Sequence, residues 1–210
     1  MLVACVKVGT VYGPEYVNRL AAMVARNTTR EYRFVCLTDD PGGLTCEALP
    51  IGTDIPGWWA KLVLFKDRVF SERVIYLDLD TVICGNIDFL FDYSGQLAML
   101  RSFLPPSRYG SAVMSFLPGL GYLWSDFTRD VMDRLYGDQD WIAERATTVD
   151  CWQDLAPGAI GSYKVDELTE GPKDFAICCF HGEPKPHDVV DGWVGDVWAG
   201  PGWIRDFAAE

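Results

Sequence analysis

The sequence feature that most constrains the fold is an apolar run that ends in two acidic residues. Residues 74–77 are all apolar, and Asp78 and Asp80 follow directly. A continuous apolar run of this length is typical of a strand buried on both faces of a parallel sheet. On an extended backbone, residues i and i+2 point to the same side. Because ligands of open α/β sheets lie beyond the carboxyl ends of the strands, the two carboxylates are predicted to converge at such a site.

Two carboxylates in one small volume repel each other unless a cation lies between them. A hard divalent ion with oxygen ligands, Mn²⁺ or Mg²⁺, is the natural partner and suits a phosphate-bearing substrate. We therefore interpret Asp78 and Asp80 as metal ligands. The simpler interpretation, a polar strand end followed by a turn, remains open.

The segments around this run predict an α/β domain with a mixed, mainly parallel central sheet flanked by helices. A strand over residues 2–8, a helix over 14–27 and a strand over 32–37 form a strand–helix–strand unit, which predicts a parallel pair. Further helices are expected over 58–70, 85–91, 121–135 and 138–145, the last with Asp138 as its cap. Strands are expected over 96–100, 112–117 and 175–180.

The chain length predicts one domain. At 210 residues it is long enough for a single large core, which we assign to residues 1–190. Residues 191–210 are rich in Trp and Gly, with Trp193, Trp198 and Trp203 five residues apart. That interval matches neither a helix nor a strand. We expect a tail that packs on the same domain.

Composition excludes several classes of protein. The net charge of −12, from 30 acids and 18 bases, argues against nucleic-acid binding. Seven cysteines without a C-x-x-C pair argue against a zinc finger and suggest thiols kept reduced in the cytoplasm. No segment reaches the length that spans a membrane. These observations predict a cytoplasmic protein and leave its oligomeric state open, a homodimer included.

A second polar cluster follows the apolar run 175–180. His181 comes directly after that run, in the way that Asp78 follows its own. An imidazole beside two carboxylates would complete a mixed nitrogen and oxygen site for Mn²⁺. Gly182 and two prolines hold Lys185 in a tight loop, where its ammonium would offset phosphate charge.

The order of these blocks resembles glycosyltransferase family 8, the glycogenin-like and galactosyltransferase-like enzymes with the GT-A fold. The stretch 76–81 with 86–91 resembles the D-x-D block and the helix after it, and 180–186 resembles the H-x-G-x-x-K-P block. Weaker likenesses are 137–139, 59–62 and 110–114. The last departs from the family pattern, since Ser111 and Ala112 replace the usual Asn-Ser or Ser-Gly pair. His187 stands where the family has tryptophan.

The resemblance implies a single, Rossmann-like GT-A domain that transfers a hexose with retention from a nucleoside-diphosphate sugar, with UDP-sugar the favoured donor, to an unknown acceptor. It implies that Asp78, Asp80 and His181 hold Mn²⁺ or Mg²⁺ and that Asp138 and Gln139 act at the sugar. The residues implied to bind the donor are Thr10, Tyr12, Lys61, Leu79, Ser111, Gly182 and Lys185. The identity of the sugar stays open.

Two other functions remain open. Asp78-x-Asp80-x-Val82 also satisfies the opening motif of haloacid-dehalogenase-type phosphatases, in which Asp78 would be the nucleophile. That family places the motif on its first strand and needs a later acidic loop, whereas here position 142 is Ile. The third possibility is a sugar-nucleotide-binding module of the same shape without turnover.

Overall fold

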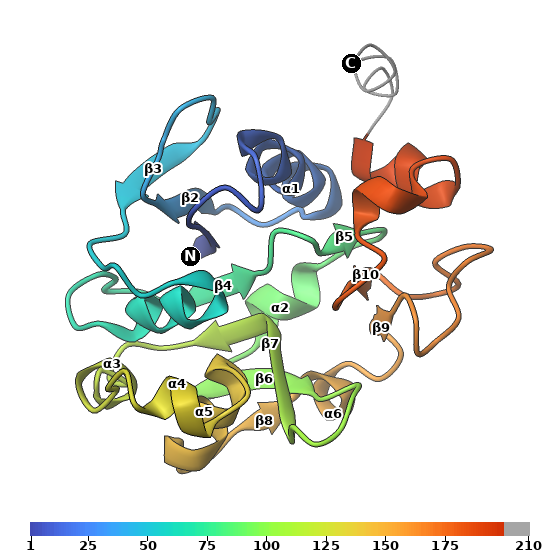
Figure 1. Cartoon of the computed structure of the whole chain (residues 1–210). Helices are drawn as coiled ribbons and strands as arrows, with labels where there is room; N and C mark the ends of the chain where they lie inside the picture. The colour runs from blue at the N-terminus through green and yellow to red at the C-terminus, as the bar shows by residue number, and fades with distance from the viewer. Residues whose placement is uncertain (200–210) are drawn as a thin grey trace.

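A computed structural model describes residues 1–199 of the protein, so the Trp203 part of the expected tail lies outside the described residues. Residues 1–199 form two sheets (Figure 1). The large sheet has seven strands in the order β3-β2-β1-β4-β7-β6-β8, and the small one has three in the order β5-β10-β9. β4, which carries the apolar run before Asp78, is the central strand of the large sheet.

The strands of the large sheet are β1 (Leu2–Lys7), β2 (Arg33–Thr38), β3 (Glu47–Pro50), β4 (Val74–Leu77), β6 (Leu97–Arg101), β7 (Tyr109–Phe116) and β8 (Asp150–Cys151). The small sheet contains β5 (Val82–Ile83), β9 (Ile160–Ser162) and β10 (Ile177–Cys179). The α-helices are α1 (Pro14–Asn27), α2 (Asp88–Asp92), α3 (Tyr122–Ser125), α4 (Val131–Arg134), α5 (Asp138–Arg145) and α6 (Trp152–Leu155). Two 3₁₀ helices, η1 (Gly57–Phe65) and η2 (Pro186–Val189), and a π-helical turn, η3 (Gly195–Ala199), complete the described chain.

The large sheet is mixed and mainly parallel, as the sequence predicts. β3, β2, β1 and β4 are parallel to one another, and β6 is parallel to β8. β7 lies between β4 and β6 and is antiparallel to both. The start of β7 therefore lies at the same edge of the sheet as the end of β4.

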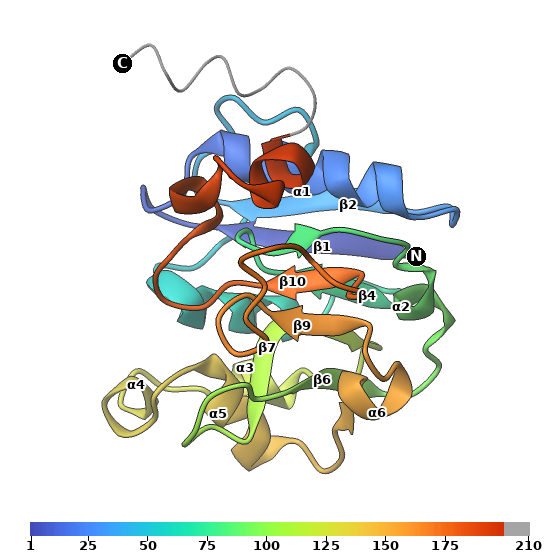
Figure 2. The same ribbon diagram turned by 90° about the vertical axis from the view of Figure 1, so that its right-hand side faces the viewer.

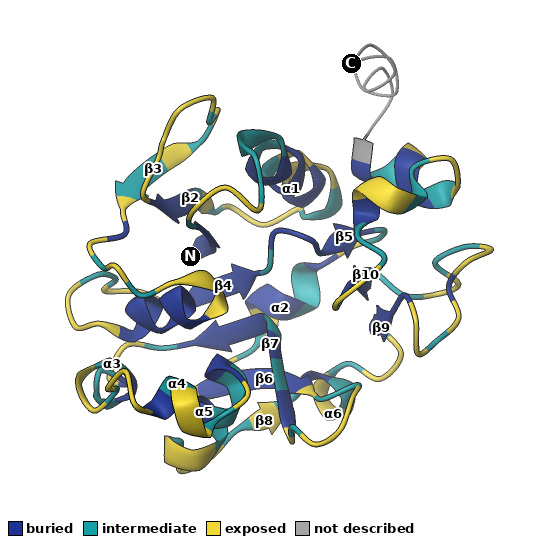
Figure 3. Ribbon diagram, in the orientation of Figure 1, coloured by how far each residue is buried: buried dark blue, intermediate teal, exposed yellow. Residues whose placement is uncertain are grey.

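Alternate residues of the central strands β1 and β4 face two separate cores. For this reason every residue of these two strands except Lys7 is apolar. Ile75 and Leu77 belong to the core under α1, the small sheet and η3. Val74 and Tyr76 belong to the other core, which η1, α3, α4 and α5 cover. Both layers appear as buried segments on either side of the sheet (Figure 3).

Two helix predictions need correction. Residues 121–135 form two single turns, α3 and α4, in place of one helix. Between them Phe127 packs against Trp59 and Trp141, at ring centroid distances of 5.5 Å and 5.9 Å, so aromatic packing overrides the helical spacing. The helix expected over 58–70 is the 3₁₀ helix η1 and stops at Phe65, since Lys66 is extended and Arg68 has φ of 67°.

The described part of the C-terminal tail lies against α1 (Figure 2). The Trp198 ring is buried, 4.0 Å from the Arg19 guanidinium carbon and 5.0 Å from the Tyr16 ring. The Trp193 indole donates a hydrogen bond of 2.6 Å to the carbonyl of Leu168. All seven cysteines are free thiols. Among residues 1–199, no helix is both long enough and apolar enough to span a membrane.

Candidate functional site

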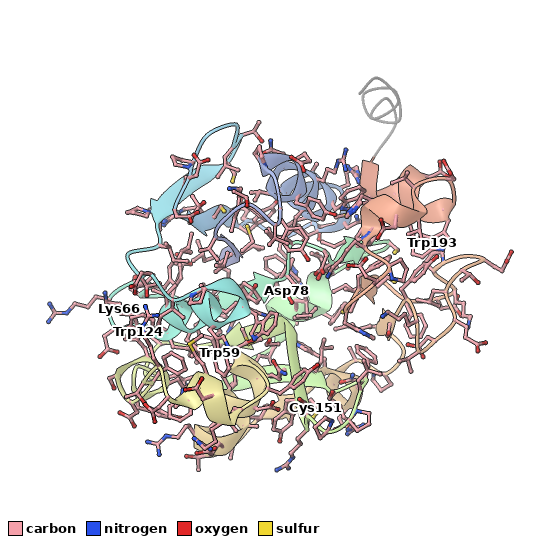
Figure 4. All side chains as sticks on the ribbon, viewed as in Figure 1. Trp59, Lys66, Asp78, Trp124, Cys151 and Trp193 are labelled. Carbon is pink, nitrogen blue, oxygen red and sulfur yellow. The ribbon has the colours of Figure 1, made fainter. Side chains whose placement is uncertain are left out.

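Several predicted site residues meet at the carboxyl end of β4. The chain leaves β4 at Leu77, and the amide of Asp78 donates a hydrogen bond of 2.8 Å to the carbonyl of Ala112 in β7. Because β7 is antiparallel to β4, this contact brings Ser111 to the same edge as Asp78. Asp78 lies near the middle of the molecule, between the layer of η1 and the elements of the small sheet (Figure 4).

The Asp78 carboxylate is held by two groups from the core side. The Lys61 ammonium, on η1, lies 3.0 Å from Oδ1, and the Tyr76 hydroxyl donates a hydrogen bond of 2.6 Å to the same oxygen. Lys61 also donates to the Ser111 hydroxyl at 2.9 Å. Tyr76 lies two residues before Asp78 on the same strand face. Sequence reasoning missed this partner, although the i, i+2 spacing could have found it.

Asp138 lies behind Lys61, away from solvent. Its carboxylate is 1% exposed and has an oxygen 3.7 Å from the Lys61 ammonium. Neither Asp138 oxygen accepts a hydrogen bond of ordinary geometry. The nearby Ser111 hydroxyl nevertheless acts to lower the pKa of Asp138 and so favours its ionised form. The expected N-cap role of the Asp138 side chain is wrong, because Gly137 is the N-cap of α5 and no side chain caps it.

Burial and charge act against each other in this lysine and carboxylate cluster. Burial raises the pKa of Asp138, and the nearby Lys61 ammonium opposes that rise in part. For Lys61, burial would lower the pKa, but the carboxylates of Asp138 and Asp78 outweigh it and raise the pKa above its usual value. Lys61 is therefore a buried ammonium between two acids, and it fixes the position of Asp78.

Asp80 has a separate set of partners. Its side chain is 10% exposed, and Oδ2 lies 2.7 Å from the Lys185 ammonium. The Tyr12 hydroxyl, from the loop after β1, donates a hydrogen bond of 2.9 Å to the same oxygen. Burial and then the charge of Asp78 raise the pKa of Asp80, while Lys185 and Tyr12 oppose the rise. Three segments far apart in the sequence thus meet at one carboxylate.

His181 follows β10 and is held by a residue that the sequence did not single out. Its Nε2 lies 2.7 Å from the hydroxyl of Ser162 at the end of β9, and its ring stacks on Phe103 at 6.0 Å. Its Nδ1 is buried without a hydrogen-bond partner. Burial, and then the charge of Lys164, lower the pKa of His181, so the imidazole is neutral near pH 7. No motif marks Ser162, because only the β9–β10 pairing brings it to His181.

The remaining predicted residues lie at various depths. Thr10 and Gly182 are exposed, and Gly182 has φ of +61°, a conformation that suits glycine. The Leu79 side chain is buried, so its backbone is the part available to contact a ligand. Gln139 is half-buried, and its amide donates a hydrogen bond of 3.3 Å to the Ser107 hydroxyl.

The oxygen and nitrogen atoms of Asp78, Asp80 and His181 suit a divalent cation, but in the described structure they are not positioned to coordinate one ion together. Within residues 1–199, no group of three or more His, Cys, Asp or Glu side chains is arranged to hold a metal ion. Lys61 and Lys185 neutralise Asp78 and Asp80 instead. Two carboxylates and the unpartnered Nδ1 of His181 still form a donor set of the type that Mn²⁺ prefers. A site formed by Asp78, Asp80 and His181 thus remains a proposal.

Comparison with solved structures finds the same fold in glycosyltransferases. GlyE of Streptococcus pneumoniae TIGR4 is 18% identical, with a TM-score of 0.61 over 88% of this chain and 55% of that one. The galactosyltransferase LgtC, in complex with donor and acceptor sugar analogs, is 14% identical, with a TM-score of 0.61 over 98% of this chain and 99% of LgtC. The bifunctional glycosyltransferase WbbM, as an apo structure, is 11% identical, with a TM-score of 0.65 over 98% of this chain and 51% of WbbM.

The chain therefore has the GT-A fold of family 8 glycosyltransferases, which confirms the fold that the sequence resemblance implied. It spans about half the length of the GlyE and WbbM chains. No protein-family model matches the sequence, and no curated protein does. At identities of 11% to 18% the likeness concerns the fold, and function depends on the residues of the site.

Proposed function

We propose that this protein is a metal-dependent, retaining glycosyltransferase that moves a hexose from a nucleoside-diphosphate sugar, in the first instance a UDP-sugar, to an acceptor not yet identified. The observation that carries the proposal is the position of Asp78 and Asp80 at the carboxyl end of β4, beside Lys61, Lys185 and Tyr12. In open α/β sheets this edge binds the ligand. The glycosyltransferase neighbours, one of them solved with donor and acceptor sugar analogs, support the same assignment.

The proposed roles follow from position. Asp78, Asp80 and His181 would hold Mn²⁺ or Mg²⁺, which when bound acts as a Lewis acid toward the diphosphate. Lys185, at the mouth of the site, would add positive charge for the leaving phosphate. Lys61 is buried and would act through Asp78, whose carboxylate it holds.

The other residues proposed to contact the nucleotide-sugar donor lie at the edges of the same site. Thr10 and Tyr12, in the loop after β1, would contact the nucleoside, and Ser111 the sugar. The backbones of Leu79 and Gly182 would face the diphosphate. Gln139 and Asp138, at the start of α5, would act at the sugar, with the half-buried Gln139 as the more accessible of the two.

Retention without a covalent intermediate is the proposed stereochemical course. A double displacement needs a carboxylate free to attack the sugar carbon. Asp78, Asp80 and Asp138 each lie within 4.0 Å of a lysine ammonium, and Asp138 is buried. We therefore propose substitution on one face, in which the departing phosphate accepts the acceptor's proton. Intact mass after incubation with donor alone should show no hexose adduct. A stable adduct on Asp138, or on Asp140 in the same first turn of α5, would replace this proposal.

The experiment that tests the function is hydrolysis of UDP-hexoses with Mn²⁺, compared with the same reaction in EDTA. Slow cation-dependent release of UDP is the expected result. Cleavage of a phosphomonoester in its place would favour the phosphatase, with Asp78 as nucleophile. Tight UDP binding without either reaction would identify a binding module. The GT-A fold favours the transferase over the phosphatase, since β4 is preceded by β1, β2 and β3 in the sequence.

A further inference from the structure

The two carboxylates proposed as cation ligands are each already paired with a lysine, but the two lysines differ. Lys61 has a side chain 8% exposed and contacts Asp78, Ser111 and Asp138, so it is fixed from several sides. The Lys185 side chain is 18% exposed, and its ammonium pairs with one carboxylate of residues 1–199, that of Asp80, at 2.7 Å. Lys185 also lies in the segment between β10 and η2, at the rim of the site. It is therefore the less constrained of the two lysines.

We propose, resting on the function proposed above, that Lys185 is a displaceable counter-ion of Asp80. Its ammonium neutralises Asp80 in the free protein and moves to the diphosphate when a divalent cation and the nucleotide bind together. The site then keeps nearly the same balance of charge in both states.

The Lys185 ammonium needs a new partner once a cation binds to Asp80. An ammonium 2.7 Å from Asp80 Oδ2 and a divalent cation on the same oxygen would repel each other strongly. Binding of the cation alone therefore leaves the Lys185 ammonium without its counter-charge, which is unfavourable for a largely buried group. A diphosphate provides the ammonium with a new partner of opposite charge. Cation and nucleotide should thus strengthen each other's binding by the same factor, because such coupling is reciprocal.

The inference predicts opposite effects of one substitution on two affinities. Lys185→Gln removes the competitor for Asp80, so Mn²⁺ alone should bind more tightly, by about tenfold. The same change removes a contact to the diphosphate, so UDP in the presence of Mn²⁺ should bind more weakly. The factor by which Mn²⁺ and UDP strengthen each other, on the order of 5 to 150 for typical coupled sites, should fall accordingly.

The experiment titrates Mn²⁺ into the full chain and follows the electron paramagnetic resonance signal of free Mn²⁺, with and without UDP. Calorimetry then gives the UDP affinity with and without Mn²⁺. Lys185→Arg keeps the positive charge and should keep the weak binding of Mn²⁺ alone. Lys66→Gln is the matched control, because Lys66 is exposed, lies well apart from Asp78 (Figure 4) and forms no ion pair with Asp78 or Asp80. It should change the affinity for Mn²⁺ alone by less than about threefold.

Unchanged or weaker binding of Mn²⁺ alone by Lys185→Gln would overturn the inference while leaving the proposed function intact. An equal gain in Lys66→Gln would also overturn it, since general electrostatics would then explain the effect. If the wild-type chain binds neither Mn²⁺ nor UDP, the proposed function and this inference fall together. Circular dichroism checks the fold, and Lys185→Met provides the same test if the Gln variant is unfolded.

Discussion

At the scale of single residues, Asp80 is the point at which three segments of the chain meet. Asp80→Asn removes the charge with little change in volume, so the fold should survive. We expect UDP affinity in Mn²⁺ to fall by at least about tenfold, to the value measured without Mn²⁺, because loss of even a group that supports a metal ligand typically costs 10- to 100-fold. Calorimetry measures the effect. Asp133→Asn, at an exposed acid on α4, is the control. Undiminished Mn²⁺ dependence in Asp80→Asn would reject the metal assignment.

His181 and Gln139 should separate nucleotide binding from chemistry. His181→Ala removes the imidazole whose Nδ1 lacks a hydrogen-bond partner, so it should weaken Mn²⁺-linked UDP binding. The Gln139 amide donates a hydrogen bond to the Ser107 hydroxyl, whereas Asp78 and Asp80 are held by lysines and tyrosines. Gln139→Ala should therefore leave the UDP affinity within about twofold and lower transfer or hydrolysis by about 10- to 1,000-fold. An equal loss of UDP affinity in both variants would contradict this division of roles.

The residues of the site were predictable where one motif carries them, and not where folding alone brings them together. Asp78 and Asp80 follow an apolar run, so their place at the edge of the sheet follows from the sequence. The pairing of Asp138 with Lys61, by contrast, depends on how α5 packs against η1. Ser162 reaches His181 through the register of β9 and β10. Such contacts between distant segments leave no local pattern of residues.

At the scale of elements, one long segment with a strong period was predicted well, whereas the helices expected over 58–70 and 121–135 were not. The helix over 14–27 has the predicted bounds, because Pro14 suits its first turn and its apolar residues line one face. Short elements were missed: β5 and β8 have two residues each, and β9 has three. Strands this short are too brief to show a period of two. Their strand geometry comes from pairing with neighbours that are distant in the sequence.

The junction between α1 and α2 gives a prediction about pH. Asp88, the first residue of α2, accepts hydrogen bonds from the Thr28 hydroxyl at 2.6 Å and from the amide and hydroxyl of Thr29 at 2.9 Å and 2.5 Å. These bonds hold the pKa of Asp88 well below its usual value. A depressed pKa means that the ionised carboxylate stabilises the folded state above the unfolded pKa of about 4. That stabilisation declines as the pH falls further.

Asp88→Asn should therefore unfold at a lower temperature than the wild type at pH 6 to 7. The difference in melting temperature should shrink as the pH falls below about 4, where the unfolded wild-type chain also binds the proton. Thermal unfolding followed by circular dichroism at a series of pH values measures it. Asp133→Asn, for which no comparable set of hydrogen bonds is found in residues 1–199, should show no such trend. A difference that stays the same down to low pH would show that these bonds do not depend on the charge.

At the scale of the whole molecule, the segment before residue 200 joins the core under α1. Val194 and Trp198 are part of that core, together with strand residues such as Val3 and Leu77. The Arg26 guanidinium donates a further hydrogen bond of 2.8 Å to the carbonyl of Val197. This arrangement supports the proposal that the tail packs on the same domain as residues 1–190 for its described part, residues 191–199. If so, the tail and the domain should unfold together.

Trp198→Ala tests that proposal. The indole is 1% exposed and packs against Arg19 and Tyr16, so its loss should leave a cavity and lower the free energy of unfolding by about 3 to 5 kcal/mol. Trp58→Ala is the matched control, since Trp58 is 58% exposed and its removal should cost less than about 1 kcal/mol. Urea unfolding followed by circular dichroism and by fluorescence should give one coincident transition in each variant. A small loss in Trp198→Ala, or a separate early transition, would mean that the tail folds independently of the domain.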